Sequence, residues 1–556
     1  MVGVGTVAGE AEPSTSAGTS RSRAVALAAI CVVLFLTFLD TTVISVALNG
    51  IEGDLGAGVV ALQWVVNGYA LAFAGLMLVG GSIGDILGRR RVMLGGIVVF
   101  IAGSVVSALA GSVTTLVAGR IVMGVGAAAS EPGTLSMLRQ LFPERRSRAR
   151  AVGAWTAMSG LALALGPVVG GILVEIGTWR AIFWFNLVLG VFALVAAAIA
   201  LPESVDREGR RLDVAGAILG AGWVTALTYA IIRGEQQGYT SPHILASFAV
   251  AVVALLLFIA VELKVADPLV DLGFFRSPTF AGANLVGFLA FFGLFTVFFF
   301  TALYLQSVPG QSAGQLAGQF APMAVAMVVA AALSGRWVAW MGPKVPMAVG
   351  CLIAAGGVYW TDSLLAPNVA YFPLALSLLV AGVGFGIALV PVTSAALAAV
   401  PGRRSGMAAS VSNTSRQLGA VVAIAVLGAI VNSALGGTLQ KRLTEQQIPA
   451  PLRAYVDKTV RAGGLPSTAS VNDYPPVLRP LVQKILDIVY SAFGDGLHTC
   501  FTIAAGLLVA GAIVAAVAVR HRSSSTEDDE DDADEDDGGE DDGRSGGGLP
   551  SPTTAS

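Results

Sequence analysis

The sequence predicts an all-α polytopic membrane protein with fourteen transmembrane helices, arranged as two six-helix halves plus two inserted helices. Three observations support this fold class. Of the 556 residues, 55% are hydrophobic and only 12% are charged, a balance that a soluble protein of this length could not bury. Apolar runs of about twenty residues, long enough to cross a bilayer as helices, recur along the chain. The chain also resembles itself at a nearly constant offset.

The chain begins with a short polar segment, residues 1–23, which we expect to be a disordered cytoplasmic tail. The apolar run that follows is too long for a signal-peptide core and lacks a cleavage site, so it should remain as the first span. The predicted spans, in order, are 24–48, 59–80, 92–111, 116–137, 149–174, 181–201, 212–232, 243–262, 279–305, 315–340, 343–362, 369–392, 405–432 and 497–519.

Basic residues cluster in alternate gaps between these runs. Arg21 and Arg23 precede the first run, Arg89–Arg91 follow the second, and Arg145–Arg150 follow the fourth. By the positive-inside rule, both termini are cytoplasmic and the protein is a multi-pass component of the cell membrane. The predicted extracellular loop 433–496 is an exception, because it is basic and long enough to escape that rule. Its segment Pro476–Phe493 has helical apolar spacing and could lie along the membrane surface.

The net charge of −3 hides a strongly acidic C-terminus. Residues 523–556 hold thirteen acids and one arginine, whereas residues 1–522 hold 32 basic and 23 acidic residues. A run of like charges repels itself and cannot form a core, so 520–556 should be an acidic, disordered cytoplasmic tail.

The internal repeat divides the rest of the chain. Three short matches recur in order at offsets of 254 to 258 residues: Gly81-x6-Gly88 with Gly335-x6-Gly342, Gly124-Val-Gly126 with Gly382-Val-Gly384, and Pro143-x-Arg-Arg with Pro401-x-Arg-Arg. The repeat predicts an N-terminal half at 24–201 and a C-terminal half at 279–519, with helices 7 and 8 inserted at 202–278. Two such halves around a central site form an architecture typical of secondary transporters.

A glycine-rich, charged turn between the second and third runs is the most distinctive local motif. It is formed by Gly81, Gly84, Asp85, Gly88, Arg89 and Arg90. Two helices that turn so tightly at the cytoplasmic face suggest a moving joint. The second copy of the repeat has Ala339 in place of Asp85, so the two halves should be unequal here.

Four charged residues lie well inside apolar runs, where unpaired charges are costly and are functional candidates: Asp40, Arg120, Glu131 and Arg416. Asp40 could exchange a proton or bind a cation, or it could be a structural acid satisfied by Thr41, Thr42 or another helix. Arg416 belongs to a polar cluster that interrupts a span. It could line a cavity or make a structural pair.

Arg120 and Glu131 are eleven residues apart on one predicted helix. That spacing places them on one face, about 16 Å apart, so each needs a partner from another helix or a cavity. Glu131 could be a second protonatable or cation-binding carboxylate, or an acid near the outer helix end that reaches water. Pro132 follows it and can bend the helix.

Small residues gather in the fifth span, at Gly166, Pro167, Gly170 and Gly171. Such residues let helices approach closely, and the Gly-Pro step can kink a helix. The segment predicts tight packing, or a leak-resistant hinge between the halves.

Other chemistry has little support. The three cysteines lie in separate runs, and only three histidines occur, so neither a disulfide framework nor a metal site is indicated. We find no nucleophile–base pair or phosphate-binding loop. We therefore expect no enzyme activity, no cofactor and no nucleic-acid partner.

Taken together, these segments resemble the major facilitator superfamily, and within it the fourteen-span drug:proton antiporters. Gly81–Arg91 is similar to the signature between helices 2 and 3. Arg120-x3-Gly124-x-Gly126 resembles the proton-coupling motif of helix 4, and Gly166-Pro167-x2-Gly170-Gly171 resembles the antiporter motif of helix 5. Leu39–Val43 resembles the first-helix motif of the fourteen-span branch. Met123 and Glu131 depart from the family pattern.

The resemblance implies a proton-driven exporter of amphipathic drugs or an antibiotic-like metabolite, working by alternating access as a monomer in the lipid bilayer. Asp85, Arg89 and Arg90 would form a charge relay at the cytoplasmic gate, Arg120 would couple proton movement to conformation, and Asp40 would exchange protons. The alternative is a facilitator or uptake transporter for a small organic solute, against which the helix-5 motif argues.

Overall fold

The fold was obtained as a computed structural model, which describes residues 16–142, 144–203, 213–265, 268–366, 370–400, 405–450, 452, 453, 456 and 479–520. The predicted N-terminal tail up to residue 15, most of the loop 433–496 beyond 450, and the acidic tail beyond Arg520 lie outside these residues. Residues 16–519 form one compact unit within the described part of the chain, and the following paragraphs concern that unit.

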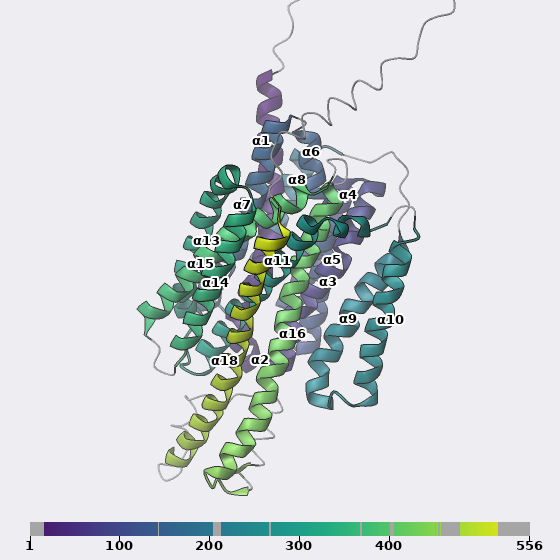
Figure 1. The fold of residues 1–556 in the computed structure, drawn as a ribbon. Coiled ribbons are helices and arrows are strands. Elements are labelled where there is room, and N and C mark those ends of the chain that lie inside the picture. The colour runs from purple at the N-terminus through teal and green to yellow at the C-terminus, as the bar shows by residue number, and fades with distance from the viewer. Residues whose placement is uncertain are drawn as a thin grey trace, which may run out of the picture. The chain divides into compact units, whose positions relative to one another are not determined.

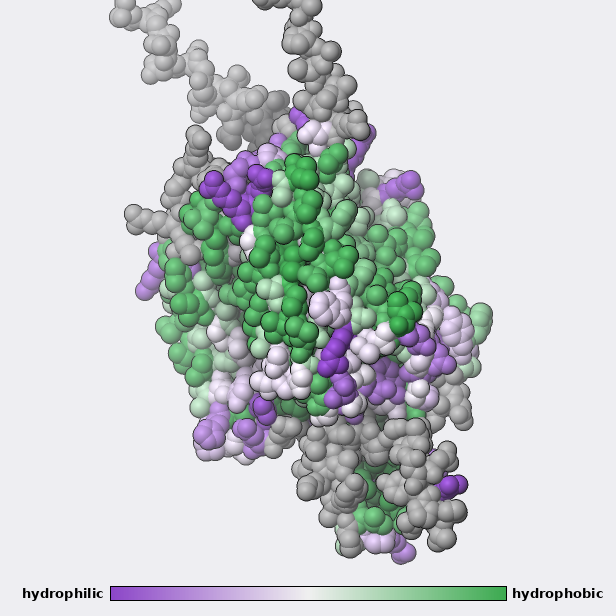
Figure 2. All heavy atoms as spheres, turned by 180° about the vertical axis from the view of Figure 1, so that it is seen from behind, coloured by the Kyte–Doolittle hydropathy of each residue, from purple (hydrophilic) through white to green (hydrophobic). Residues whose placement is uncertain are grey.

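The described residues contain 14 helices long and apolar enough to cross a membrane, which confirms the predicted fold class. On the face drawn in Figure 2, hydrophobic side chains cover a broad area, and hydrophilic ones gather toward its two ends. The principal helices are α1 (Ser16–Val43), α2 (Leu48–Leu55), α3 (Val59–Leu87), α4 (Arg89–Ala108), α5 (Val113–Ser130), α6 (Pro132–Leu141), α7 (Arg145–Ile176), α8 (Arg180–Ala200), α9 (Val214–Gln237), α10 (Pro242–Glu262), α11 (Pro278–Thr296), α12 (Ala302–Ser307), α13 (Ala313–Met341), α14 (Lys344–Leu364), α15 (Tyr371–Ala398), α16 (Ser405–Glu445) and α18 (Arg479–Ala518).

The two halves pack their helices in the same pattern, which explains the sequence repeat. In the N-terminal half, α1 packs on α7 and α8, α5 packs on α3 and α4, and α4 packs on α8. In the C-terminal half, α11 packs on α16 and α18, α15 packs on α13 and α14, and α14 packs on α18. Each contact therefore recurs between helices at corresponding positions in the repeat.

The two most extensive contacts between the halves are also related by the repeat, α3 with α16 and α7 with α13. The inserted helices α9 and α10 pair with each other beside this bundle (Figure 1). Of the two, α9 packs on α3 and α16, whereas α10 exposes most of its surface. The insertion thus covers one seam between the halves from outside and does not enter it.

Two spans at corresponding positions are not regular α-helices. The first span changes to a 3₁₀-helix, η1 (Ile44–Ala47), before it continues as α2. The ninth span changes to a π-helix, η3 (Val297–Thr301), before it continues as α12. Such interruptions leave backbone groups for other partners and mark hinges or binding sites in transporters. Both irregular segments are fully buried, and α12 contacts η1 across the seam between the halves.

Prolines inside three helices each have a partner for the backbone carbonyl that they free. A proline cannot donate to the carbonyl four residues earlier, and such a group is costly inside a membrane. Pro167 frees the carbonyl of Leu163, which accepts instead from the Thr42 hydroxyl of α1 at 2.9 Å. The same relation holds for Pro391, with Ser334 donating to Ile387 at 2.9 Å, and for Pro322, with Tyr371 donating to Gly318 at 3.1 Å.

The segment Pro476–Phe493 differs from our expectation. From Arg479 it belongs to α18, one helix of 40 residues that continues into the last span, so it cannot lie along the membrane surface while that span crosses it. Helix α16, with 41 residues, is equally long. At 1.5 Å per residue each is about 60 Å long, twice the thickness of a bilayer core. The two extend together beyond the neighbouring helices (Figure 1).

Candidate functional site

The predicted site residues Asp40 and Arg120 form an ion pair inside the N-terminal half. Nη1 of Arg120 on α5 donates to Oδ2 of Asp40 on α1, and both side chains are 0% exposed. The second carboxylate oxygen of Asp40 accepts from Nδ2 of Asn186 on α8 at 2.6 Å. The hydroxyls of Thr41 and Thr42 donate to backbone carbonyls and not to the carboxylate of Asp40.

The guanidinium of Arg120 is held from a fourth helix as well. Its Nε donates to the backbone carbonyl of Val65 at 3.1 Å, and its centre lies 4.6 Å from the ring centroid of Tyr69. The Tyr69 hydroxyl in turn donates to the carbonyl of Thr37 at 2.8 Å. Nη2 of Arg120 is buried without a hydrogen-bond partner among the described residues. Four helices therefore converge on one pair of opposite charges.

This arrangement can couple a proton to helix packing. Two buried charges stabilise a bundle only while both are present, and removing one leaves the other uncompensated at a cost of about 3–5 kcal/mol. A proton that neutralises Asp40 removes the pair and leaves the cation on α5 with carbonyl and aromatic partners only. Gain or loss of one proton can therefore change how α1, α3, α5 and α8 hold together.

Glu131 and Arg416 are joined across the seam between the halves by a single asparagine. Nδ2 of Asn413 on α16 donates to Oε1 of Glu131 at 2.8 Å, and Oδ1 of Asn413 accepts from Nη2 of Arg416. Glu131 is 1% exposed and Arg416 is 7% exposed. Oε2 of Glu131 and Nε of Arg416 have no hydrogen-bond partner in the described part of the chain. Each of the two charged side chains in this bridge therefore keeps one polar atom without a hydrogen-bond partner among the described residues.

The structure corrects our second interpretation of Glu131, that of an acid near the outer end of its helix reaching water. The residue lies between the end of α5 and the start of α6 at Pro132, where the helix is broken as expected. The span begins at Val113 and ends at Leu138, so Glu131 lies near its C-terminal end. That end is beside the glycine-rich turn, not at the opposite side of the bundle. A Cβ placed on Gly81 would lie 3.4 Å from Cβ of Pro132.

The glycine-rich turn forms as predicted, with Gly88 joining α3 to α4 at a φ of 107°. The side chain of Asp85 lies outside the described part of the chain, so the predicted relay from Asp85 to Arg89 and Arg90 stays a prediction. Glu203, after α8, is an acid that sequence analysis missed. Its carboxylate accepts from the backbone N–H of Arg90 at 3.2 Å and pairs with Arg91 at 3.4 Å.

The small residues of α7 face two different neighbours. A Cβ on Gly166 would collide with Thr42 of α1, and a Cβ on Gly170 would collide with Val43 of α1 and Val46 of η1. A Cβ on Gly171 would lie 2.6 Å from Cβ of Ala317 on α13, in the other half. The motif therefore packs the fifth span against the irregular first span and against the opposite half at once. The geometry agrees with tight packing, whereas the leak-resistant hinge between the halves stays a prediction.

Polar contacts also close the seam at the end of the bundle remote from the glycine-rich turn, hereafter the distal end. Oε1 of Gln306 on α12 accepts from the backbone N–H of Asn49 at 2.9 Å, and its Nε2 donates to the carbonyl of Ser45 at 3.4 Å. Glu175 on α7 accepts from the backbone N–H of Gly314 on α13 at 2.9 Å. Neither Gln306 nor Glu175 was singled out from the sequence, since only their partners 139 to 261 residues away give them a role.

The candidate site thus consists of two separate charge groups, Asp40 with Arg120 and Glu131 with Arg416. The interface of α3 and α16 holds further buried polar side chains without hydrogen-bond partners among the described residues. These are Gln63, Asn67 and Gln417. Buried polar groups without partners are costly, and where they gather between movable parts they indicate space for a ligand or water.

Comparison with known proteins agrees with this geometry. The family model described as "Major Facilitator Superfamily" matches residues 30–424. The chain is 31% identical to "Multidrug resistance protein Stp" of Mycobacterium tuberculosis, over 79% of this chain and 81% of that protein. It is 30% identical to "Tetracenomycin C resistance and export protein" of Streptomyces glaucescens, over 88% and 90%.

A solved structure shares the fold. It is the inward-facing, occupied form of a bacterial homologue of the human lysosomal transporter Spinster, with a TM-score of 0.58 and 18% identity, covering 89% of this chain and 96% of that one. The family match spans more than half of the sequence, and the helix packing repeats between the two halves. The chain therefore belongs to the Major Facilitator Superfamily.

Proposed function

We propose that this protein exports amphipathic drugs or antibiotic-like metabolites across the cell membrane in exchange for protons. The two relatives are named for multidrug resistance and for export of an antibiotic, and each aligns along more than three quarters of this chain. The observation that carries proton coupling is the Asp40–Arg120 pair, because it is the site where one proton would alter contacts among four helices. No covalent step is needed, so the protein acts as a transporter and not as an enzyme.

The bridge between Glu131 and Arg416 supplies the second element of the proposal. While Asn413 links the two charges, the halves are tied together next to the glycine-rich turn. A cationic or amphipathic compound entering the seam from that end could use the free oxygen of Glu131, and this would weaken the tie. Transport then requires that proton and substrate favour different states, since a ligand shifts an equilibrium only by its differential affinity.

The direction of transport rests on orientation. Arginine-rich gaps lie on the side of the glycine-rich turn, so that side would face the cytoplasm and the distal end would face outside. Both termini would then be cytoplasmic. Because each half supplies one side of the seam, a single chain contains a complete pathway, and we propose that it works as a monomer.

Transport into everted membrane vesicles tests the proposal. Vesicles with an acidic interior should accumulate a fluorescent cationic drug when they contain the wild-type protein, and collapse of the pH gradient should release it. Asp40→Asn and Glu131→Gln should each abolish or strongly reduce accumulation. Glu445→Gln, which removes an exposed acid remote from both charge groups, serves as the control.

Two results would contradict the proposal. Accumulation that persists without a pH gradient would show that protons do not drive transport. Equal flux in both directions, set by the drug gradient alone, would favour a facilitator for a small organic solute.

A further inference from the structure

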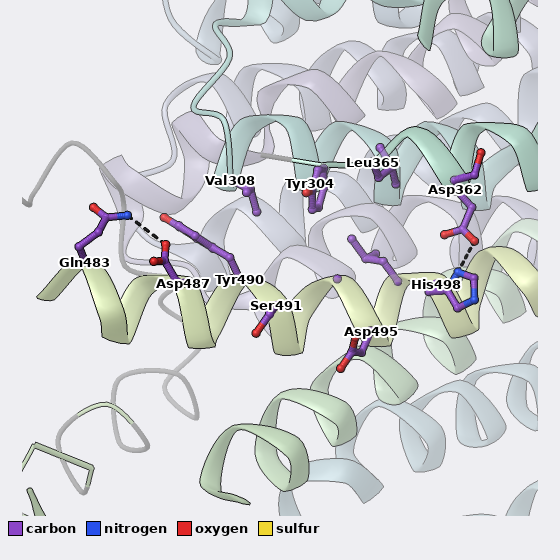
Figure 3. Close-up of a pocket in the computed structure, with 13 residues that line it drawn as sticks. Tyr304, Val308, Asp362, Leu365, Gln483, Asp487, Tyr490, Ser491, Asp495 and His498 are labelled. Carbon is purple, nitrogen blue, oxygen red and sulfur yellow. Dashed lines mark hydrogen bonds and ion pairs between the residues drawn. The ribbon is translucent and has the colours of Figure 1, made fainter. Parts of the chain in front are cut away.

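A second polar site lies at the distal end, away from both charge groups. Helices α12, α14 and α18 enclose a cavity of about 630 Å³ there, within the usual size range of pockets for drug-sized ligands. Figure 3 shows the α18 side chains along one wall, with Gln483 and Asp487 at one end and His498, which pairs with Asp362 of α14, at the other. Tyr304 and Tyr490 lie between these ends.

The charges in this cavity do not balance. Asp362 pairs with His498, and Asp495 pairs with Arg442 of α16 at 2.5 Å. Asp487 accepts a hydrogen bond from Gln483 at 3.0 Å, but no cation pairs with it in the described part of the chain. The histidine compensates Asp362 only while it is protonated. The cavity therefore has one carboxylate, that of Asp487, without a cationic partner in the described part of the chain.

The hydroxyl of a buried tyrosine in the same cavity also lacks a hydrogen-bond partner among the described residues. Tyr304 is 3% exposed, and its ring stacks on Phe493 at a centroid distance of 6.2 Å and an interplanar angle of 12°. Its hydroxyl is not among the fully buried polar atoms, so it opens toward the cavity, where a ligand can supply the hydrogen bond that it lacks. Val308 and Leu365 line the wall near this ring. An aromatic and aliphatic wall next to an unpaired carboxylate suits a ligand with an apolar body and one positive charge.

We propose that this cavity binds amphipathic organic monocations, with the positive charge at Asp487 and the apolar body against Tyr304, Val308 and Leu365. It would hold an exported compound at the distal end after the compound leaves the seam between the halves. This role rests on the proposed function, whereas binding itself does not. Along α18 the eleven residues from Asp487 to His498 span about 16 Å, enough for a ligand of several fused rings.

Photolabelling and equilibrium binding test the site directly. The probes are ethidium monoazide, a photoreactive aromatic monocation, and ethidium itself, both applied to the purified full-length protein in detergent. Labelled peptides should include Tyr304–Val308 or Gln483–His498. Asp487→Asn should weaken ethidium binding at this site about tenfold, the loss expected for one charge-assisted contact. Since Asp487 is exposed, this variant should fold normally.

A control variant makes the test specific. Glu445→Gln removes an acid at the distal end of α16 that does not line the cavity. This variant should bind ethidium like the wild type. If Asp487→Asn behaves like Glu445→Gln, or if label is found only on helices around the seam, the proposed site does not exist.

The outcomes separate this site from the proposed function. Vesicles that export ethidium normally, while no label reaches α12 or α18, would overturn the distal site and leave the export proposal standing. Label in the cavity that Asp487→Asn abolishes, in a protein that transports nothing, would support the site and contradict proton-driven export.

Discussion

Asp40, Arg120 and Glu131 each bind partners that are distant in sequence. Arg120 reaches Asp40 across 80 residues, and Asn186 completes the carboxylate from 146 residues away. All three belong to separate helices, so the pair forms only when the N-terminal half is assembled. A change in the charge of one side chain can therefore alter the packing of the whole half.

The ion pair can be tested for its effect on stability apart from transport. Asp40→Asn should destabilise the protein by about 3–5 kcal/mol, because it leaves the Arg120 cation buried without a counter-charge. Adding Arg120→Gln removes that cation, so the double variant should be more stable than Asp40→Asn alone. Thermal unfolding of the purified protein in detergent measures both. Asp54→Asn breaks an exposed ion pair with Arg180 and should change the unfolding temperature little. A double variant less stable than the single one would contradict the pairing.

The sequence indicated which residues carry chemistry but not how they pair. Asp40, Arg120, Glu131 and Arg416 stood out because charges are rare inside apolar runs. Their partners could not be found in this way, since Asn186 and Asn413 are neutral and asparagines have many uses. One of the two interpretations of Glu131, an acid near the outer helix end that reaches water, is wrong, because the residue is buried beside the glycine-rich turn. Glu203 escaped notice because acids near helix ends are common and its contact with Arg90 is 113 residues distant.

At the scale of helices, proline residues determine which neighbours a span requires. Pro167 leaves the Leu163 carbonyl of α7 free, and Thr42 of α1 supplies the donor from the same turn that carries Asp40. The fifth span is thereby tied to the first beside the candidate proton site. The proline and the nearby glycines are visible in the sequence. The hydrogen bond from Thr42 to Leu163 could not be predicted from it, because the two residues are 121 positions apart.

Thr42→Val should therefore destabilise the protein by about 1 kcal/mol, because it keeps the shape of the side chain and removes the donor to a buried carbonyl. Thermal unfolding in detergent provides the measurement. Thr225→Val is the matched control, since that exposed hydroxyl bonds to Ala221 of its own helix, four residues earlier, at 2.8 Å. Equal shifts for the two variants would show that the freed carbonyl has no need of Thr42.

The glycines of α7 allow a second test at this scale. Gly171→Ala should slow drug transport severalfold, because its Cβ would press on Ala317 and separate α7 from α13 in the other half. Gly160→Ala lies on the same helix and has no atom within 4 Å of its Cβ position, so it should transport like wild type. Initial rates in everted vesicles, normalised to the amount of protein, provide the comparison. A normal rate for Gly171→Ala would mean that this contact does not limit the transport cycle.

At the scale of the whole molecule, hydropathy and the repeat were sufficient for the architecture. Fourteen apolar runs became fourteen candidate spans, and corresponding helices pack alike in the two halves. The lengths of α16 and α18 could not be predicted in the same way. Beyond the membrane these helices continue through polar sequence, where apolar periodicity is weak and helix ends are hard to place. Irregular turns such as η1 and η3 have no sequence signal comparable to a proline and were missed for that reason.

Orientation can be tested on the intact molecule with two cysteine variants. Glu445→Cys, at the end of α16, should react with a membrane-impermeant maleimide in intact cells, because we expect the distal end to face outside. Arg91→Cys, next to the glycine-rich turn, should react only in everted vesicles. The three native cysteines are all buried, so the wild-type protein provides a low background. The reverse pattern of labelling would invert the proposed topology and the direction of transport.

The central claim is that export is coupled to protons through Asp40, and direct measurement of proton movement tests it best. The purified protein is reconstituted into proteoliposomes that contain a pH-sensitive dye, and drug is added outside without an imposed gradient. The wild-type protein should produce a drug-dependent change of internal pH that a protonophore abolishes. Asp40→Asn should still bind the drug but produce no such change. If Asp40→Asn moves protons with the drug as the wild type does, the account is wrong.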